Sequence, residues 1–242
     1  RSSAASDVYK RQIMPSMAPE SEPSVYPTFI PSALPTSTLI YGIDYAVSIG
    51  GNADDYVRSV ASFDDGSSVI TGYYSSSSLS FGSHLPSLQN NGNGNLDIFI
   101  AKISSNGTWI WAEGVGGSSD DVGYSVASFD DGSSVITGRY ASSSLSFGSH
   151  LPSLQNNGLQ DIFIAKISSN GTWIWAEGVG GSSNDIGYSV ASFDDGSSVI
   201  TGFYSSSSLS FGSHLPSLQD NGNGNIFIAK ISSNGTWIWA EG

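Results

Sequence analysis

The sequence ASFDDGSSVITG runs from Ala61 to Gly72 and returns unchanged at Ala127–Gly138 and Ala191–Gly202. The surrounding sequence recurs with it, in units of 64 to 66 residues as the spacing of these copies shows. Self-similarity at a fixed period is typical of one supersecondary unit stacked on copies of itself. The sequence therefore predicts a repeat architecture before any single element is assigned.

Each unit is expected to fold as two β-hairpins. Four segments of the second copy are the expected strands: Tyr124–Phe129, Ser134–Tyr140, Asp161–Ile167 and Thr172–Glu177. The turns between them are Asp130–Gly132 and Ser168–Gly171, whose Asp-Gly and Asn-Gly pairs favour tight hairpins because glycine supplies a positive φ. A looser stretch at residues 141–160 separates the two hairpins.

Apolar residues occur on both faces of these expected strands. Ile162 and Ile164 alternate with Phe163 and Ala165, so each sheet is expected to be covered on both sides. A four-stranded sheet stacked between its own copies is a propeller blade, whereas the repeats of the rival β-solenoid usually form one short coil each. We predict an all-β fold, a β-propeller fragment of about three four-stranded antiparallel blades.

The chain is expected to contain three regions. Asp7–Gln12 is what GATGTGTATAAGAGACAG encodes, a string that resembles a sequencing adapter, so we expect residues 1–12 to be an assembly artefact. Residues 13–38 carry proline at every fourth position and predict a Pro/Ser/Thr-rich disordered linker or stalk. Residues 39–242 form the expected partial propeller.

Within residues 39–242 the expected repeat units are about 45–111, 112–175 and 176–242. Tyr45–Gly51 aligns with Trp111–Gly117 and is expected to be a degenerate outer strand that precedes the three units. Propellers close with 4–8 blades, so three cannot make a ring. The remaining blades of a longer parent chain, or other copies of the chain, are therefore expected partners.

Composition excludes several classes of function. Twenty-one acidic residues against 8 basic ones give a net charge of −13, which argues against nucleic acid and against anionic membrane surfaces. No apolar run has the roughly 20 residues that a spanning helix needs, so no membrane insertion is expected. No cysteine is present, which excludes disulfides and thiolate metal sites. Low charge with abundant serine and glycine is typical of extracellular or cell-surface β proteins.

Several motifs resemble a known family in a fixed order. The motifs are GGxxxDxGYSVA, DGSSVITG, DIFIAK and NGTWIWA, which together resemble the SBBP-type β-propeller repeats over residues 45–242. The resemblance implies a large secreted or surface protein, and no shared catalytic activity is attached to that family. The insert at residues 141–160 is longer than the leanest blades of the family carry.

Acidic loops are the candidate metal sites. The loop after each Gly-Gly pair carries Asp54 and Asp55, Asp120 and Asp121, or Asn184 and Asp185. Ca²⁺ takes 6–8 oxygen ligands, so these loops are weak calcium candidates. Asp and Asn are also ordinary turn formers, and no cofactor is otherwise expected.

Three further sets of residues are candidates for chemistry, each with a structural alternative. The three Trp-x-Trp pairs, such as Trp173 and Trp175, place two rings on one strand face, as a sugar platform or, as we favour, as inter-blade core. The column His84, His150 and His214 is expected to be structural or exposed. Asp64 lies in an approximate Asp-box, in which the carboxylate accepts backbone N–H groups across the turn.

The copies differ chiefly in two columns and in the loops between the hairpins. The columns are Arg58/Tyr124/Tyr188 and Tyr73/Arg139/Phe203, and the loops are Asn90–Leu96, Asn156–Gln160 and Asp220–Asn225. Recognition that distinguishes one blade from another must use these positions. The candidate ligand-binding residues are Arg139, Tyr73, Phe203, Asn91 and Asn93.

The sequence therefore predicts a non-catalytic extracellular scaffold that binds a protein or a glycan. An enzyme of the sialidase or lyase type is one alternative, with its catalytic residues outside this sequence, since no pairing of nucleophile, base and orienting group is visible here. A structural cell-wall or matrix array is the other alternative, which many further near-identical copies would favour.

Overall fold

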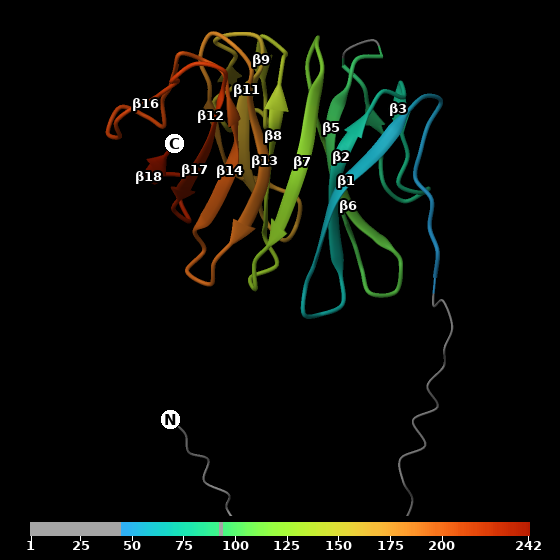
Figure 1. The fold of residues 1–242 in the computed structure, drawn as a ribbon. Coiled ribbons are helices and arrows are strands. Elements are labelled where there is room, and N and C mark those ends of the chain that lie inside the picture. The colour runs from blue at the N-terminus through green and yellow to red at the C-terminus, as the bar shows by residue number, and fades with distance from the viewer. Residues whose placement is uncertain (1–44, 92–93) are drawn as a thin grey trace, which may run out of the picture. The chain divides into compact units, whose positions relative to one another are not determined.

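Three four-stranded antiparallel sheets make up the folded part of the chain in the computed structural model, which describes residues 45–91 and 94–242. The predictions for residues 1–12 and 13–38, and for Asn93, lie outside the described residues. The sheets repeat along the chain and stack on one another, as propeller blades do. The predicted all-β fold with about three four-stranded blades is confirmed (Figure 1).

The strands of each sheet follow one order. The first sheet is β1 (Asp55–Ser62), β2 (Ser68–Tyr74), β5 (Asp97–Ile103) and β6 (Trp109–Val115). The second is β7 (Asp121–Ser128), β8 (Ser134–Tyr140), β11 (Asp161–Ile167) and β12 (Trp173–Val179). The third is β13 (Asp185–Ser192), β14 (Ser198–Tyr204), β17 (Asn225–Ile231) and β18 (Trp237–Glu241).

A short two-stranded ladder lies in the insert between the hairpins of each sheet. These ladders are β3 (Ser78–Leu79) with β4 (Leu88–Gln89), β9 (Ser144–Leu145) with β10 (Leu154–Gln155), and β15 (Ser208–Leu209) with β16 (Leu218–Gln219). In the second sheet Phe147 of the insert packs edge-on against Trp173, with ring centroids 4.8 Å apart. The insert therefore covers its own sheet with apolar side chains.

The first hairpin of each sheet turns where the Asp-Gly signal predicted. Gly132 has a φ of 81°, a conformation that glycine adopts without steric cost. The Asp131 carboxylate accepts the N–H of Ser133 at 2.9 Å and closes the turn. Asp65 does the same for Ser67, so the prediction that Asp64 supplies this carboxylate was wrong by one residue.

The two tryptophans of each pair lie on opposite faces, which corrects the expectation that they share one. A β-bulge between Lys166 and Ile167 shifts the register, so that Ile167 lies opposite Trp173 and Lys166 opposite Trp175. Trp173 belongs to the core between the first and second sheets, and Trp175 to the core between the second and third. Both are buried, so their predicted place in the inter-blade core is confirmed.

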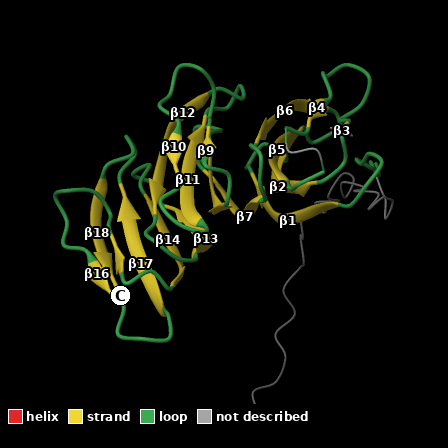
Figure 2. Ribbon diagram, turned by 90° about the horizontal axis from the view of Figure 1, so that it is seen from above, coloured by secondary structure: helices red, strands yellow, loops and turns green. Residues whose placement is uncertain are grey.

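Neighbouring sheets are joined along the strands β1, β7 and β13, which lie side by side (Figures 1 and 2). Ser59 Oγ accepts the N–H of Val126 at 3.2 Å. At the outer edge Trp111 Nε1 donates to the Ser169 carbonyl of the next sheet at 2.9 Å. Polar bonds at both edges thus fix how each sheet sits on the next.

The segment Tyr45–Gly51 forms no strand, contrary to the expectation, and has only an isolated bridge between Gly50 and Ser80. It nevertheless occupies the position that its alignment implied. The Tyr45 ring lies against Gly107, as the Trp111 ring lies against Gly171. In the first two sheets the last strand continues to Val115 and Val179, beyond the unit boundaries expected at 111 and 175.

Over residues 45–91 and 94–242 the structure contains no helix long and apolar enough to cross a membrane.

Candidate functional site

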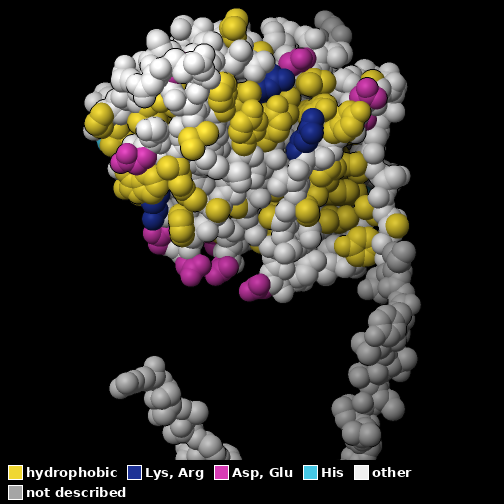
Figure 3. Space-filling view, viewed as in Figure 1, with side chains coloured by type: hydrophobic (Ala, Val, Ile, Leu, Met, Phe, Trp, Pro, Cys, Tyr) yellow, Lys and Arg dark blue, Asp and Glu magenta, His cyan; other side chains and the backbone are white. Residues whose placement is uncertain are grey.

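The two columns of residues that differ between the copies lie on the two innermost strands of each sheet. We call this region the inner-strand surface; it comprises Tyr56, Arg58, Tyr73, Tyr124, Arg139, Tyr188 and Phe203. Figure 3 views the molecule from the side of β1, β7 and β13, where hydrophobic side chains gather beside separate Lys and Arg side chains. All seven side chains are at least partly exposed.

A bulge in each innermost strand explains why one column projects from the sheet. The register shifts between Val57 and Ser59, and the same shift recurs in the other two sheets, so Arg58, Tyr124 and Tyr188 have no partner in the ladder. A bulge re-aims the side chain of the extra residue and increases the local twist. The backbone therefore presents these three side chains in one equivalent position.

In the first sheet the bulged residue is an arginine that lies beside two tyrosines, whose ring centroids are 5.3 Å apart. Arg58 Nη2 donates to the Tyr73 hydroxyl at 3.2 Å. Its guanidinium carbon lies 5.1 Å from the centroid of the Tyr73 ring and 6.0 Å from that of Tyr56. These are distances at which a cation is attracted to an aromatic face.

In the second sheet the same pair occurs with its members exchanged. Tyr124 occupies the bulge, and Arg139 on β8 donates from Nε to the Tyr124 hydroxyl at 3.3 Å. Arg139 Nη1 donates to the Asp120 carbonyl at 3.3 Å, and the Tyr124 ring lies 5.8 Å from that of Tyr188. The arginine thus stays beside a tyrosine but moves from the first strand to the second.

Neither arginine forms an ion pair with a carboxylate among the described residues. Within the described part of the chain the structure has one ion pair, between Lys230 and Asp195 at 3.8 Å. Guanidinium groups recognise carboxylate, sulfate and phosphate through paired hydrogen bonds, and aromatic rings offer flat apolar area beside them. The inner-strand surface can therefore bind an anionic group attached to a planar or ring-shaped apolar face.

Phe203 and Asn91, the other predicted ligand residues that the structure describes, have structural contacts. The Phe203 ring lies against the backbone of Gly224 in the loop before β17. Asn91 donates its backbone N–H to Asp97 Oδ2 at 2.7 Å, so this part of its loop is tied to the first sheet. The loop before β17 thus contacts the variable residue Phe203, and the loop before β5 is bonded to the first residue of that strand.

The predicted calcium residues hold the chain together. Asp121 accepts the N–H groups of Ala141, Ser142 and Gly117 at 3.0 to 3.1 Å and the Ser142 hydroxyl at 2.7 Å. These four bonds use the acceptor sites of a carboxylate. Asp55 and Asp185 are bonded in the same way to their own loops.

The preceding residues Asp54 and Asp120 have fewer side-chain hydrogen bonds. Asp120 Oδ1 accepts the N–H of Leu96 at 3.1 Å, and the Asp54 carbonyl accepts that of Ser75 at 3.0 Å. Among the residues that the structure describes, no group of three or more His, Cys, Asp or Glu side chains could hold a metal ion together.

A second set of buried carboxylates was missed in the sequence. Asp97 and Asp161 begin β5 and β11, are fully buried, and each has one carboxylate oxygen without a hydrogen-bond partner. Loss of hydration is the main reason why the pKa of each rises to about 6. The third sheet has Asn225 at this position, a difference between copies that could have revealed them.

The histidine column is structural, as expected. Nε2 of His84 donates to the carbonyl of Trp109 at 2.7 Å, and His150 and His214 make the same bond in their own sheets. Each bond ties the insert to the last strand of its sheet.

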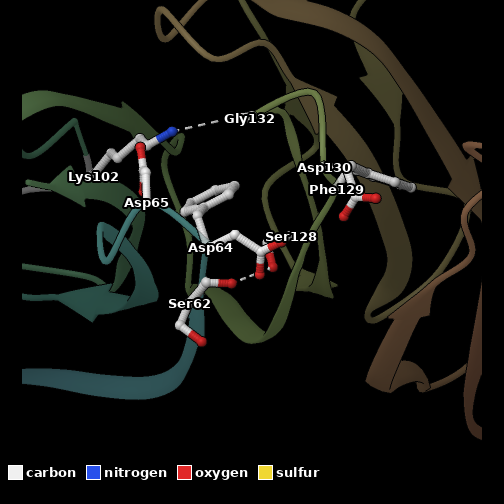
Figure 4. A pocket seen from close by; sticks show the side chains of 9 residues that line it. Ser62, Asp64, Asp65, Lys102, Ser128, Phe129, Asp130 and Gly132 are labelled. Atoms are coloured by element: carbon white, nitrogen blue, oxygen red, sulfur yellow. Dashed lines mark hydrogen bonds between the residues drawn. The ribbon is translucent and has the colours of Figure 1, made fainter. Parts of the chain in front are cut away.

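A cleft lies between the Asp-Gly turns of the first two sheets, with a volume of about 240 Å³ (Figure 4). Asp64 and Asp130 line it, and Lys102 donates to the Gly132 carbonyl at 3.2 Å while lying 3.8 Å from the Phe63 ring centroid. A similar cleft of about 220 Å³ lies between the second and third sheets. Each cleft therefore arises because identical Asp-Gly turns of neighbouring sheets lie next to each other.

A scan against models of known protein families finds no match to this chain, and a search of curated proteins also finds none. The resemblance to the SBBP-type repeats stays a prediction.

Proposed function

We propose that this chain is a non-catalytic extracellular β-propeller scaffold that binds an acidic glycan through the inner-strand surface. The supporting observation is the placement of Arg58 and Arg139 beside exposed tyrosine rings, with no carboxylate partner within residues 45–91 and 94–242. Sugar rings pack on aromatic faces, and guanidinium groups bind the carboxylates or sulfates of such glycans. In a chain with a net charge of −13, such a local site selects the anion by contact rather than by long-range attraction.

The experiment is a binding assay of the full chain on immobilised polyuronate oligosaccharides, with neutral dextran as the reference sugar. We expect binding to the polyuronates alone, with a loss of about tenfold or more in Arg58→Ala and in Arg139→Ala, the order of one charge-assisted bond. Lys230→Ala is the matched control, because it removes one positive charge outside the surface. If the variant that combines Arg58→Ala and Arg139→Ala binds the polyuronates as well as the natural chain does, this surface is excluded as the binding site. Selective binding of dextran would exclude acidic glycans as the ligand class.

A further inference from the structure

The outward face of the third sheet exposes residues whose counterparts are buried in the first two sheets. Ile98 and Ile162 are fully buried, whereas Ile226 is 78% exposed. Trp111 is buried against the next sheet, whereas Trp239 is 37% exposed. We call the group Thr201, Ile226, Ile228 and Trp239 the third-sheet face; Thr201, Ile226 and Ile228 also line a hollow of about 410 Å³.

The opposite end of the stack carries the complementary surface. Val126 and Val190 are buried against the sheet that precedes each of them, whereas Val60 in the first sheet is 65% exposed. Val57 beside it is also exposed. We call Val57 and Val60 the first-sheet face.

Polar groups at the third-sheet face repeat those that join the sheets within the chain. Ser59 Oγ and Ser125 Oγ each accept a backbone N–H from the next sheet at 3.2 Å, and Ser189 holds the equivalent position in the third. Trp175 Nε1 donates to Ser233 of the next sheet at 3.0 Å, and Trp239 Nε1 has no such partner among the described residues. The chain itself thus shows which contacts this face forms when it is covered.

We propose that a second copy of this chain docks head to tail, with its first-sheet face on the third-sheet face of its neighbour. Among the residues that the structure describes, the first-sheet face is the exposed surface that matches the two internal interfaces along the innermost strands. At the outer edge Tyr45 lies against Gly107, where the ring of an incoming Trp239 would lie, so docking requires Tyr45 to move away from this turn. Two chains joined in this way at both ends supply six sheets, within the range of 4–8 in which propellers close. A head-to-tail contact that does not close gives open filaments instead.

One residue sets the strength of this contact. Val57 stands where the second and third sheets have Gly123 and Gly187. A Cβ added at Gly123 would lie 2.7 Å from Thr71 Oγ1, so the internal interfaces leave no room for a side chain at this position. Val57 therefore weakens the contact between chains relative to those within the chain.

The test is the oligomeric state of the full chain, measured by sedimentation velocity over a range of concentrations. We expect concentration-dependent association that Ile226→Asp and Val60→Asp each reduce by about a hundredfold or more, since each buries a charge. Val57→Gly should tighten association about tenfold or more, because it restores the glycine of the internal interfaces. Ile110→Asp is the control, because Ile110, Ile174 and Ile238 are each 46% exposed whether or not a sheet follows.

Mixing the two charged variants separates head-to-tail docking from pairing of two identical faces. Ile226→Asp keeps its first-sheet face and Val60→Asp keeps its third-sheet face, so an equimolar mixture should form a heterodimer. Circular dichroism confirms that each variant is folded. Monomers at all concentrations for both the natural chain and Val57→Gly would overturn the proposal, as would a loss of association in Ile226→Asp alone.

Discussion

Asp97 and Asp161 destabilise the folded state at neutral pH in a way that Asn225 does not. Burial raises the pKa of each carboxyl from 3.8 to about 6, so the folded chain binds more protons than the unfolded chain between these values. Stability is therefore lost as the pH rises through this window. Carboxyls whose pKa is lowered in the folded chain, such as Asp131, have the opposite effect: the stability that they contribute is lost as the pH falls below this window.

Replacing Asp97 or Asp161 with asparagine should stabilise the chain at pH 7.5 by about 1 to 3 kcal/mol, because no buried charge remains. The gain should shrink at pH 4.5, where the carboxyls of the folded chain are protonated. Urea unfolding at the two pH values measures both quantities.

Asp121→Asn is the matched control on a neighbouring buried strand end. Burial raises the pKa of Asp121 as well, and the hydrogen bonds from Ser142, Ala141 and Gly117 oppose this rise. Asp121→Asn should nevertheless destabilise the chain, because an amide cannot accept the four bonds that Asp121 accepts. Destabilisation by all three variants would contradict the account of Asp97 and Asp161.

At the scale of elements, the contacts between sheets depend on single atoms at their edges. Trp175→Phe keeps an aromatic ring but removes the donor to Ser233. We expect a loss of about 1 kcal/mol in the free energy of unfolding, the usual net contribution of such a bond. Trp239→Phe removes the same atom where no described residue accepts it, and should change stability less. Equal losses measured by urea unfolding would contradict this role.

The close approach of the strands gives a second prediction. Gly123→Ala places a Cβ 2.7 Å from Thr71 Oγ1 and 3.1 Å from the Gly72 carbonyl, and should cost about 1 to 3 kcal/mol. Gly50→Ala is the control, since its Cβ would meet nothing closer than an Asp55 oxygen at 3.9 Å. Thermal unfolding measures the loss of stability in each variant. Equal losses in Gly123→Ala and Gly50→Ala would show that the contact between the sheets accommodates a Cβ without cost.

Short-range sequence signals predicted the strands and turns of each sheet more accurately than they predicted the contacts between side chains. The Asp-Gly and Asn-Gly pairs fixed both hairpins, because a tight turn depends on a few adjacent residues. The separation of Trp173 from Trp175 depends on a bulge, which arises from pairing across strands and leaves no short-range signal. The meeting of Arg58 with Tyr73 follows from the fold, although the variable columns already pointed to these residues.

At the scale of the whole molecule, stability is expected to vary along the stack. The second sheet has a neighbour on both faces, whereas the third has one exposed face. In repeat proteins each unit is stabilised chiefly by contacts with its neighbours, so local opening concentrates where a neighbour is absent.

Amide hydrogen exchange should therefore be faster in β17 and β18 than in β11 and β12, when measured on the monomeric Val60→Asp variant. The sequences being compared are nearly identical, so the difference reports position rather than composition. Uniform protection across the sheets would contradict stabilisation by neighbours.

The exchange of arginine and tyrosine between the first two sheets has a consequence for how a ligand is oriented. Arg58 projects from the innermost strand of the first sheet and Arg139 from the second strand of the second sheet, so the two positive charges do not occupy equivalent positions in the repeat. A polymer carrying one acid group per sugar would meet two unequal anchors in a fixed sequence. Reversing the polymer would mismatch both, so the chain would distinguish the reducing end of a bound glycan from its non-reducing end.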